Sequence, residues 1–146
     1  MKTYENGVCM SVEVLWDDEA KTIVRFVYEG KWDWNDFYTQ IDAANAMMDT
    51  VSLPCVSLID MTKSSYLPPN AAIHIRNVIQ RSMSHNNSGI SVFLNAGMFV
   101  EMMIGIVSKI NPDIAENTEW LYTDDPAEAR QMARREVEKL HATQTG

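Results

Sequence analysis

The sequence contains little that could build a disulfide framework, a metal site or a phosphate-binding loop. Its 146 residues include 2 cysteines, 3 histidines and 6 scattered glycines. No Cys or His pair has the spacing of zinc ligands, and no glycine-rich loop is followed by a phosphate-binding lysine. Cys9 and Cys55 have apolar neighbours, so we expect both thiols to be buried and reduced. The sequence therefore predicts neither a metal nor a cofactor.

Basic residues are also few, because 12 Lys and Arg stand against 20 Asp and Glu, a net charge of −8. This balance argues against nucleic acid as a partner, since DNA and RNA attract clustered basic side chains. The first residues lack the apolar core of a signal peptide. The longest apolar stretch, Ile90–Val107, is interrupted by Asn95, Gly97 and Glu101, so no membrane span is predicted. We expect a cytoplasmic protein.

Motifs of nucleophilic and acid–base catalysis are missing as well. There is no Gly-x-Ser-x-Gly motif, and the three histidines His74, His85 and His141 are expected to be structural. The acidic pair Asp17–Asp18 falls in a predicted turn, where solvated carboxylates are the ordinary case. The sequence thus predicts no catalytic residue.

The hydrophobic fraction of 46% is that of an ordinary globular chain, and the length suits a single domain over 1–146 with a core over about 8–141. Strict alternation predicts a strand over Met10–Trp16, and a second β-rich run covers Thr22–Glu29. Only a short polar turn separates them, so they should pair as an antiparallel hairpin.

Strands and helices then alternate. We expect helices over 34–48, 70–83, 98–110 and 125–140, and strands over 55–60, 90–95 and 117–123. This order predicts an α/β fold with a mostly parallel five-stranded sheet and an antiparallel first strand. Polar residues such as Arg25, Ser57 and Ser91 alternate with apolar ones, whereas a sheet covered on both faces is apolar nearly throughout. We therefore expect a one-sided (βα)4 superhelix with all helices on one face.

Three local sequences resemble the STAS domain of anti-sigma-factor antagonists, also called the SpoIIAA-like domain. They are GKWDWNDF at 30–37, LID at 58–60 and TDDPAEA at 123–129. The resemblance covers residues 8–141 and is nearest to the stand-alone bacterial members of that family. It implies the SpoIIAA-like fold and a regulatory, protein-binding role without catalysis.

The resemblance also points to the loop after Asp60. In regulatory STAS domains an Asp-Ser-Ser-Gly motif, with a phosphorylated serine, follows in this region. Here Pro68–Ala71 stands at that place and contains no hydroxyl group, so the phosphorylation switch is not carried over. Phosphorylation elsewhere in the loop, at Thr62, Ser64 or Ser65, would be a displaced version of it. The candidate regulatory or partner-binding residues of this loop are Asp60, Thr62, Ser64, Ser65 and Asn70.

The segment 98–110 is too apolar for a simple outer helix and contains three of the ten methionines. Its apolar residues form two rows, one starting at Met98 and one at Phe99, of which we expect one in the core. The other needs cover from a neighbouring helix, a second subunit or a ligand. Trp32 and Tyr38 are expected nearer the surface than Trp34 and Phe37. The candidate interface or ligand residues are therefore Trp32, Tyr38, Met98, Met102 and Met103.

Three functions remain open. The sequence favours a non-catalytic regulatory or protein-interaction module of STAS type that forms a homodimer. The alternative is a carrier of a small apolar or lipid-like ligand. An enzyme is the third option, and it would use polar groups near the start of the helix over 70–83, namely Asp60, Thr62, His74 and Arg76.

Overall fold

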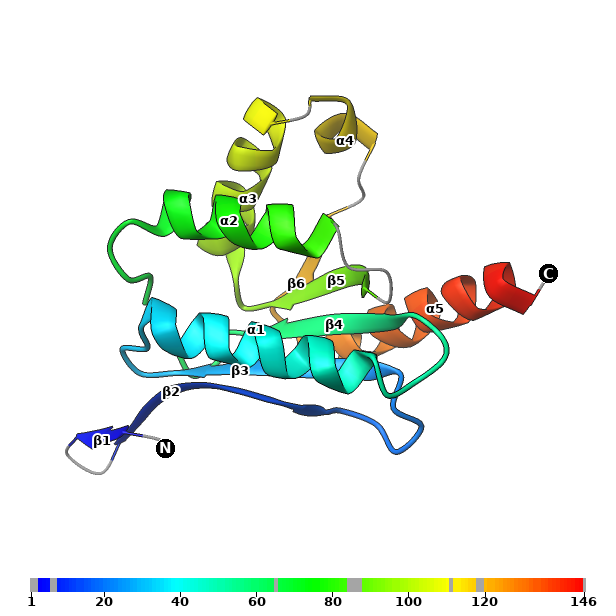
Figure 1. Cartoon of the computed structure of the whole chain (residues 1–146), viewed down its shortest axis with the longest axis horizontal. Helices are drawn as coiled ribbons and strands as arrows, with labels where there is room; N and C mark the ends of the chain where they lie inside the picture. The colour runs from blue at the N-terminus through cyan, green and yellow to red at the C-terminus, as the bar shows by residue number, and fades with distance from the viewer. Residues whose placement is uncertain are drawn as a thin grey trace.

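The computed structural model describes residues 3–5, 8–64, 66–83, 88–110, 112–117 and 120–145. Six strands form a sheet in the order β1-β2-β3-β4-β5-β6 (Figure 1). They are β1 (Thr3–Glu5), β2 (Val8–Trp16), β3 (Ile23–Glu29), β4 (Cys55–Asp60), β5 (Ser88–Leu94) and β6 (Leu121–Thr123). β2 pairs antiparallel with β1 and with β3, whereas β3 to β6 run parallel. Strands β2–β6 confirm the predicted sheet, and β1 adds a short edge strand.

The predicted helices are present as α1 (Trp34–Met48), α2 (Ala71–Met83), α3 (Gly97–Ile110) and α5 (Pro126–Thr145). Asp33 caps α1, and its carboxylate accepts a hydrogen bond of 2.8 Å from the backbone N–H of Asp36. A short helix, α4 (Pro112–Asn117), was not predicted. It begins at Pro112, which suits the first position of a helix. The expected strand over 117–123 is wrong at Asn117, which ends α4, and at Trp120, whereas residues 118 and 119 lie outside the described part of the chain; β6 begins at Leu121.

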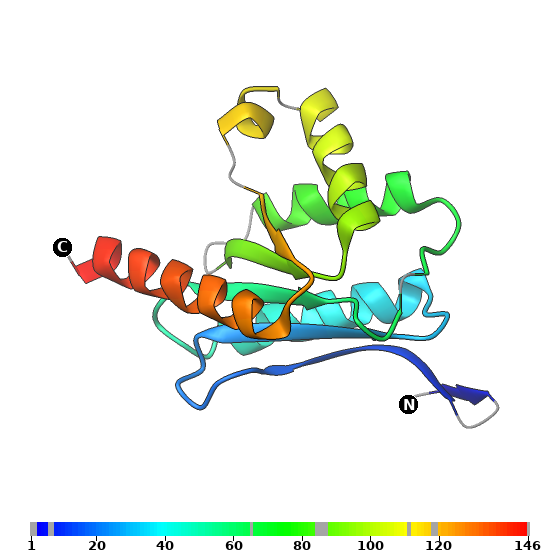
Figure 2. The same cartoon turned by 180° about the vertical axis from the view of Figure 1, so that it is seen from behind.

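Helices lie on both faces of the sheet. One face carries Val24, Phe26 and Ile59, and it forms the main core with α1, α2 and α3. The opposite face carries Ile23, Leu58 and Val92, which pack against α5. Figures 1 and 2, which view the molecule from opposite sides, show α1 in front of the sheet and α5 behind it. The one-sided arrangement of helices expected from the sequence is therefore wrong.

The polar residues that suggested an uncovered face do not share one face. Ser57 pairs in register with Val24 and is buried on the α1 side, whereas Arg25 lies on the α5 side. The α5 face is covered only in part, because α5 packs on β3 to β6 and leaves β2 open (Figure 2). Leu15 on β2 is 39% exposed as a result.

Helix α5 can approach the sheet closely because Ala129 and Ala133, both fully buried, face it. We predict that Ala133→Leu lowers the free energy of unfolding by about 1–3 kcal/mol, since the larger side chain has no room there. Urea unfolding would measure this. Arg134→Leu on the exposed side of α5 is the control and should change stability by no more than about 0.5 kcal/mol. Equal stability of the two variants would contradict the packing of α5 on this face.

Among the described residues, no helix is long and apolar enough to cross a membrane. Cys55 is buried and unpaired, as predicted. Burial raises the pKa of its thiol to about 11, with a smaller contribution from Asp18, so the thiol stays protonated at neutral pH. The side chain of Cys9 lies outside the described part of the chain.

Candidate interaction site

The carboxyl ends of β3, β4 and β5 meet at one edge of the sheet, where α1, α2 and α3 begin. Loops at this edge carry ligand- and partner-binding residues in many open α/β sheets, because the rigid strands position them. Asp60 is the last residue of β4, and Thr62, Ser64 and Asn70 lie in the loop that follows it. Ser65 lies outside the described residues.

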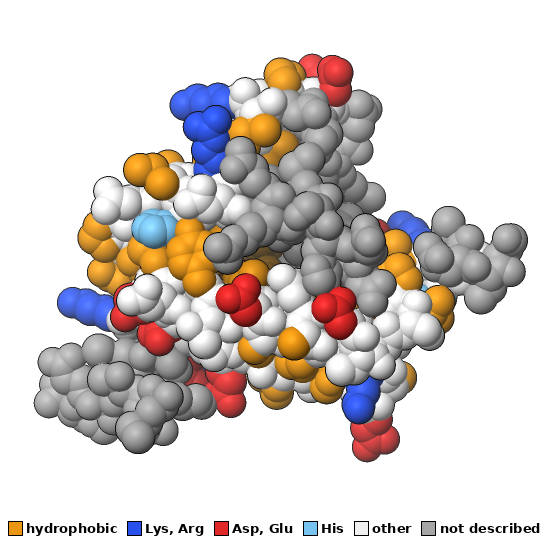
Figure 3. Space-filling view, in the orientation of Figure 1, with side chains coloured by type: hydrophobic (Ala, Val, Ile, Leu, Met, Phe, Trp, Pro, Cys, Tyr) orange, Lys and Arg blue, Asp and Glu red, His pale blue; other side chains and the backbone are white. Residues whose placement is uncertain are grey.

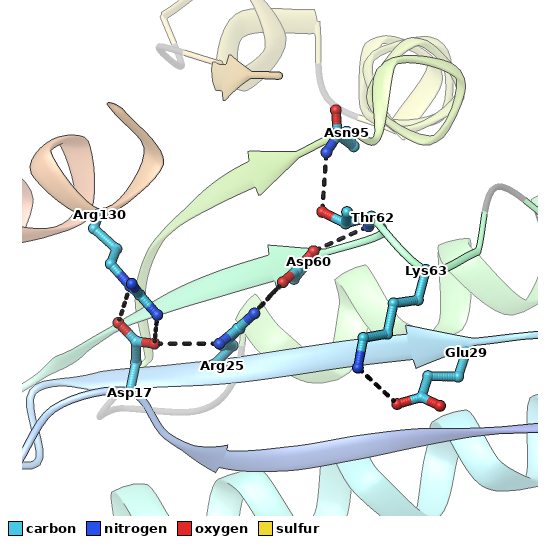
Figure 4. Close-up of polar contacts among 8 residues, drawn as sticks. All are labelled: Asp17, Arg25, Glu29, Asp60, Thr62, Lys63, Asn95 and Arg130. Atoms are coloured by element: carbon cyan, nitrogen blue, oxygen red, sulfur yellow. Dashed lines mark hydrogen bonds and ion pairs between the residues drawn. The ribbon is translucent and has the colours of Figure 1, made fainter. Parts of the chain in front are cut away.

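Asp60 is the buried polar centre of this edge (Figure 4). One carboxylate oxygen accepts a hydrogen bond of 2.9 Å from the backbone N–H of Thr62. The other accepts a bond of 3.2 Å from Nε of Arg25 and forms an ion pair with Nη2 of the same side chain. Burial alone would raise the pKa of Asp60, but the hydrogen bonds from Thr62 and Arg25 outweigh it and lower the pKa. Asp60 is therefore ionised and positions the start of the loop.

The polar contacts continue from Arg25 across the α5 face of the sheet. Its Nη1 lies 3.8 Å from Oδ1 of Asp17, and both oxygens of Asp17 accept bonds of 3.3 Å from Arg130 on α5. The charges alternate in sign along Arg130, Asp17, Arg25 and Asp60 (Figure 4). The side chain of Asp17 is only 6% exposed, so the expectation of a solvated turn carboxylate is wrong for this residue. Instead it links the β2–β3 turn to α5.

The two described hydroxyls of the predicted loop have different surroundings. Ser64 is buried, and its hydroxyl donates to the carbonyl of Gly30 and accepts from the backbone N–H of Tyr66. Thr62 is exposed, and its hydroxyl accepts a bond of 2.9 Å from the side-chain amide of Asn95. Ser64 thus holds the loop against the end of β3, whereas Thr62 faces solvent.

Asn70 and Asn95 both have positive φ angles, 64° and 54°. Asparagine adopts this conformation more readily than most residues, and here it turns the chain from a loop or strand into α2 and α3. Asn70 is exposed, as its proposed role requires. Asn95 was not predicted, although an asparagine directly between a strand and a helix was a usable signal.

An aromatic corner joins the end of β3 to α1. Trp32 is only 1% exposed, so its expected place near the surface is wrong. The physical reason is that three rings surround it: those of Tyr28, Trp34 and Phe37 have centroids 4.9, 5.0 and 5.7 Å from its own. The corner belongs to the core.

The same corner connects α1 to the start of α2. The indole N–H of Trp34 donates to the carbonyl of Pro69 at 2.8 Å, and its ring stacks on His74 with centroids 4.7 Å apart. The hydroxyl of Tyr38 lies 2.8 Å from Nδ1 of His74. Tyr38 and His74 are both half-buried and contribute to this joint.

Helix α3 rises from the carboxyl edge and packs against α2 and α4 (Figure 1). The row that contains Phe99 and Val107 is the buried one. In the other row Met98 is 70% exposed. Met102 and Met103 are half-buried against the main core. Neighbouring helices therefore cover most of α3, as one of the predicted alternatives requires, but they leave Met98 uncovered.

Three of the five large hydrophobic side chains that the described residues expose lie at this edge: Tyr66 (36%), Ile73 (63%) and Met98 (70%). We call these three residues the edge patch. Ile73 and Met98 occupy the first turns of α2 and α3, and Tyr66 lies in the loop before α2. Figure 3 shows hydrophobic side chains gathered over the starts of α1 and α2. Ile73 was missed because it falls outside the apolar stripe of its helix.

No cluster of three potential metal ligands occurs among the described residues. Comparison of the chain with protein-family models, with curated proteins and with solved structures gives no match. The resemblance to the STAS domain accordingly stays a prediction.

Proposed function

We propose that this chain is a non-catalytic regulatory or protein-interaction module of STAS type that docks its partner on the edge patch. The observation that carries the proposal is the exposure of Ile73 and Met98 on the first turns of α2 and α3, two helices that pack against each other. Exposed apolar side chains gathered at one place are typical of protein-binding surfaces. A cytoplasmic location is part of the proposal and is supported by the unpaired thiol of Cys55.

The bonding of the edge's polar groups supports a role without catalysis. Asp60 is ionised, and its two carboxylate oxygens accept hydrogen bonds from Thr62 and from Arg25. A general base must instead direct its free lone pair at a substrate. These side chains serve the structure of the edge.

Photo-crosslinking tests the docking surface. A photoreactive amino acid at position 73 or 98 should give the same protein adduct in cells that make the chain and its natural partners. The same amino acid at Leu15, which lies on the opposite face of the sheet, is the control and should not give that adduct. An adduct of twice the chain's mass would identify the proposed homodimer. Equal labelling from all three positions, or none from 73 and 98, would contradict the proposal.

A carrier of a small apolar ligand is the second candidate, and one observation favours it. The indole nitrogen of Trp32 is buried, and the described residues give it no hydrogen-bond partner. An unpaired buried donor is costly, and a ligand oxygen would satisfy it. Native mass spectrometry of freshly purified protein should then show a copurified molecule. A mass equal to that of the bare chain in repeated preparations would contradict the carrier function.

A further inference from the structure

The partner's chemistry can be inferred from the surroundings of the edge patch, an inference that rests on the proposed function. Met98 offers a flexible apolar contact, Ile73 adds a branched apolar side chain, and Tyr66 adds a ring with a polar tip. The bond between Tyr38 and His74 fixes the start of α1 beside that of α2. A partner that covers the edge patch would therefore also contact α1, whose start lies beside that of α2.

Helix α1 is acidic along its length. Between Lys31 and Lys63 the sequence has no Lys, Arg or His, whereas it has five Asp residues. Four of the five, Asp33, Asp36, Asp42 and Asp49, belong to α1 or cap its ends. Figure 3 shows acidic side chains along α1, next to the hydrophobic side chains over its start.

One basic side chain near the patch is already paired with a carboxylate. Nζ of Lys63 lies 3.4 Å from a carboxylate oxygen of Glu29, so that pair is neutral. Lys31 and Arg76 are exposed near the starts of α1 and α2, and Glu101 is exposed one turn after Met98. Burial, and next the charge of Asp33, raise the pKa of Asp36, so a cation beside these two carboxylates would be stabilised.

We infer that the edge patch and the acidic side of α1 together bind an amphipathic protein segment whose apolar side chains are flanked by Lys or Arg. The apolar face covers Ile73 and Met98, while the basic side chains lie against α1. The net charge of −8 accelerates the approach of such a basic partner.

Two synthetic amphipathic helices test this inference. They share one leucine face and the same length, and they differ only in having lysine or glutamate on the other face. Fluorescence anisotropy should give the lysine peptide an affinity at least about tenfold higher, with a strong decrease in added salt. Ile73→Ser should weaken its binding by about tenfold, whereas Leu15→Ser on the opposite face should not. Asp33→Asn combined with Asp36→Asn, in which asparagine can still cap α1, should weaken the binding of the lysine peptide alone.

The outcomes separate the inference from the proposed function. Equal binding of both peptides, sensitive to Ile73→Ser, would overturn the basic partner and leave the docking surface intact. Binding of neither peptide at about 1 mM would contradict both. Lysine-peptide binding that Ile73→Ser and Leu15→Ser affect equally would overturn the assignment to the edge patch. Stronger binding to vesicles of phosphatidylglycerol than to the lysine peptide would replace the protein partner by a membrane surface.

Discussion

Asp60→Ala is expected to lower the free energy of unfolding by about 2–4 kcal/mol, a large share of the stability of a domain of this size. The substitution removes the acceptor of Arg25 and of the Thr62 N–H. Arg25 then keeps a charge that is only partly solvated, since 28% of its side chain is exposed. Urea unfolding followed by circular dichroism measures the effect.

Two further variants show whether the loss comes from the buried pair. Glu29→Ala breaks the exposed pair with Lys63 at the same edge, and it should cost no more than about 1 kcal/mol. Arg25→Met combined with Asp60→Leu replaces both charges with apolar groups and should recover much of the stability lost in Asp60→Ala. A loss of the same size in Glu29→Ala and Asp60→Ala would contradict the central role given to Asp60.

The same pair makes stability depend on pH. The pKa of Asp60 is lower in the folded protein than in the unfolded chain, so the ionised form stabilises the fold. This contribution is fully present above the unfolded pKa of about 3.9 and is lost as pH falls through the folded pKa. The difference in stability between the native chain and Asp60→Asn should therefore shrink below about pH 4.

Local patterns explain why most of the fold could be predicted. The alternation in β2 and the β-rich run of β3 depend on neighbouring residues, and the structure has both strands. The face of the sheet that α5 covers depends on contacts between distant segments, such as those of Ala129 and Ala133 with Leu58 and Val92. The alternation of polar and apolar residues could not reveal which face α5 covers, because a buried serine and an ion-paired arginine are both polar residues.

The candidate site could likewise be predicted only in part. Asp60 and Thr62 were singled out through the resemblance to the STAS domain, and the structure does bring them together. Their partners are distant in the chain, since Arg25 belongs to β3 and Asn95 follows β5, and Asp17 and Arg130 are 113 residues apart. No spacing rule connects residues over such distances. Trp32 was misplaced for a related reason, because only the folded corner shows that three other rings enclose it.

The second large effect on stability is expected from substitutions of Trp32. Trp32→Ala should lower the free energy of unfolding by about 3–5 kcal/mol, because it leaves a cavity among Tyr28, Trp34 and Phe37. Trp32→Phe keeps most of the ring contacts and removes an N–H that has no partner among the described residues. It should therefore cost less than about 1.5 kcal/mol. Urea unfolding of both variants gives the comparison.

The relative cost of the two substitutions also bears on the function. If the indole N–H is unpaired, Trp32→Phe loses only packing and stays well above Trp32→Ala in stability. If a copurified ligand accepts a hydrogen bond from that N–H, Trp32→Phe should lose the ligand as well as the stability that its binding adds. If Trp32→Phe has a clearly lower free energy of unfolding and its mass spectrum no longer shows the ligand, the carrier function is favoured. A small loss with no ligand in either form would favour the interaction module, in which Trp32 supports the start of α1 beside the edge patch.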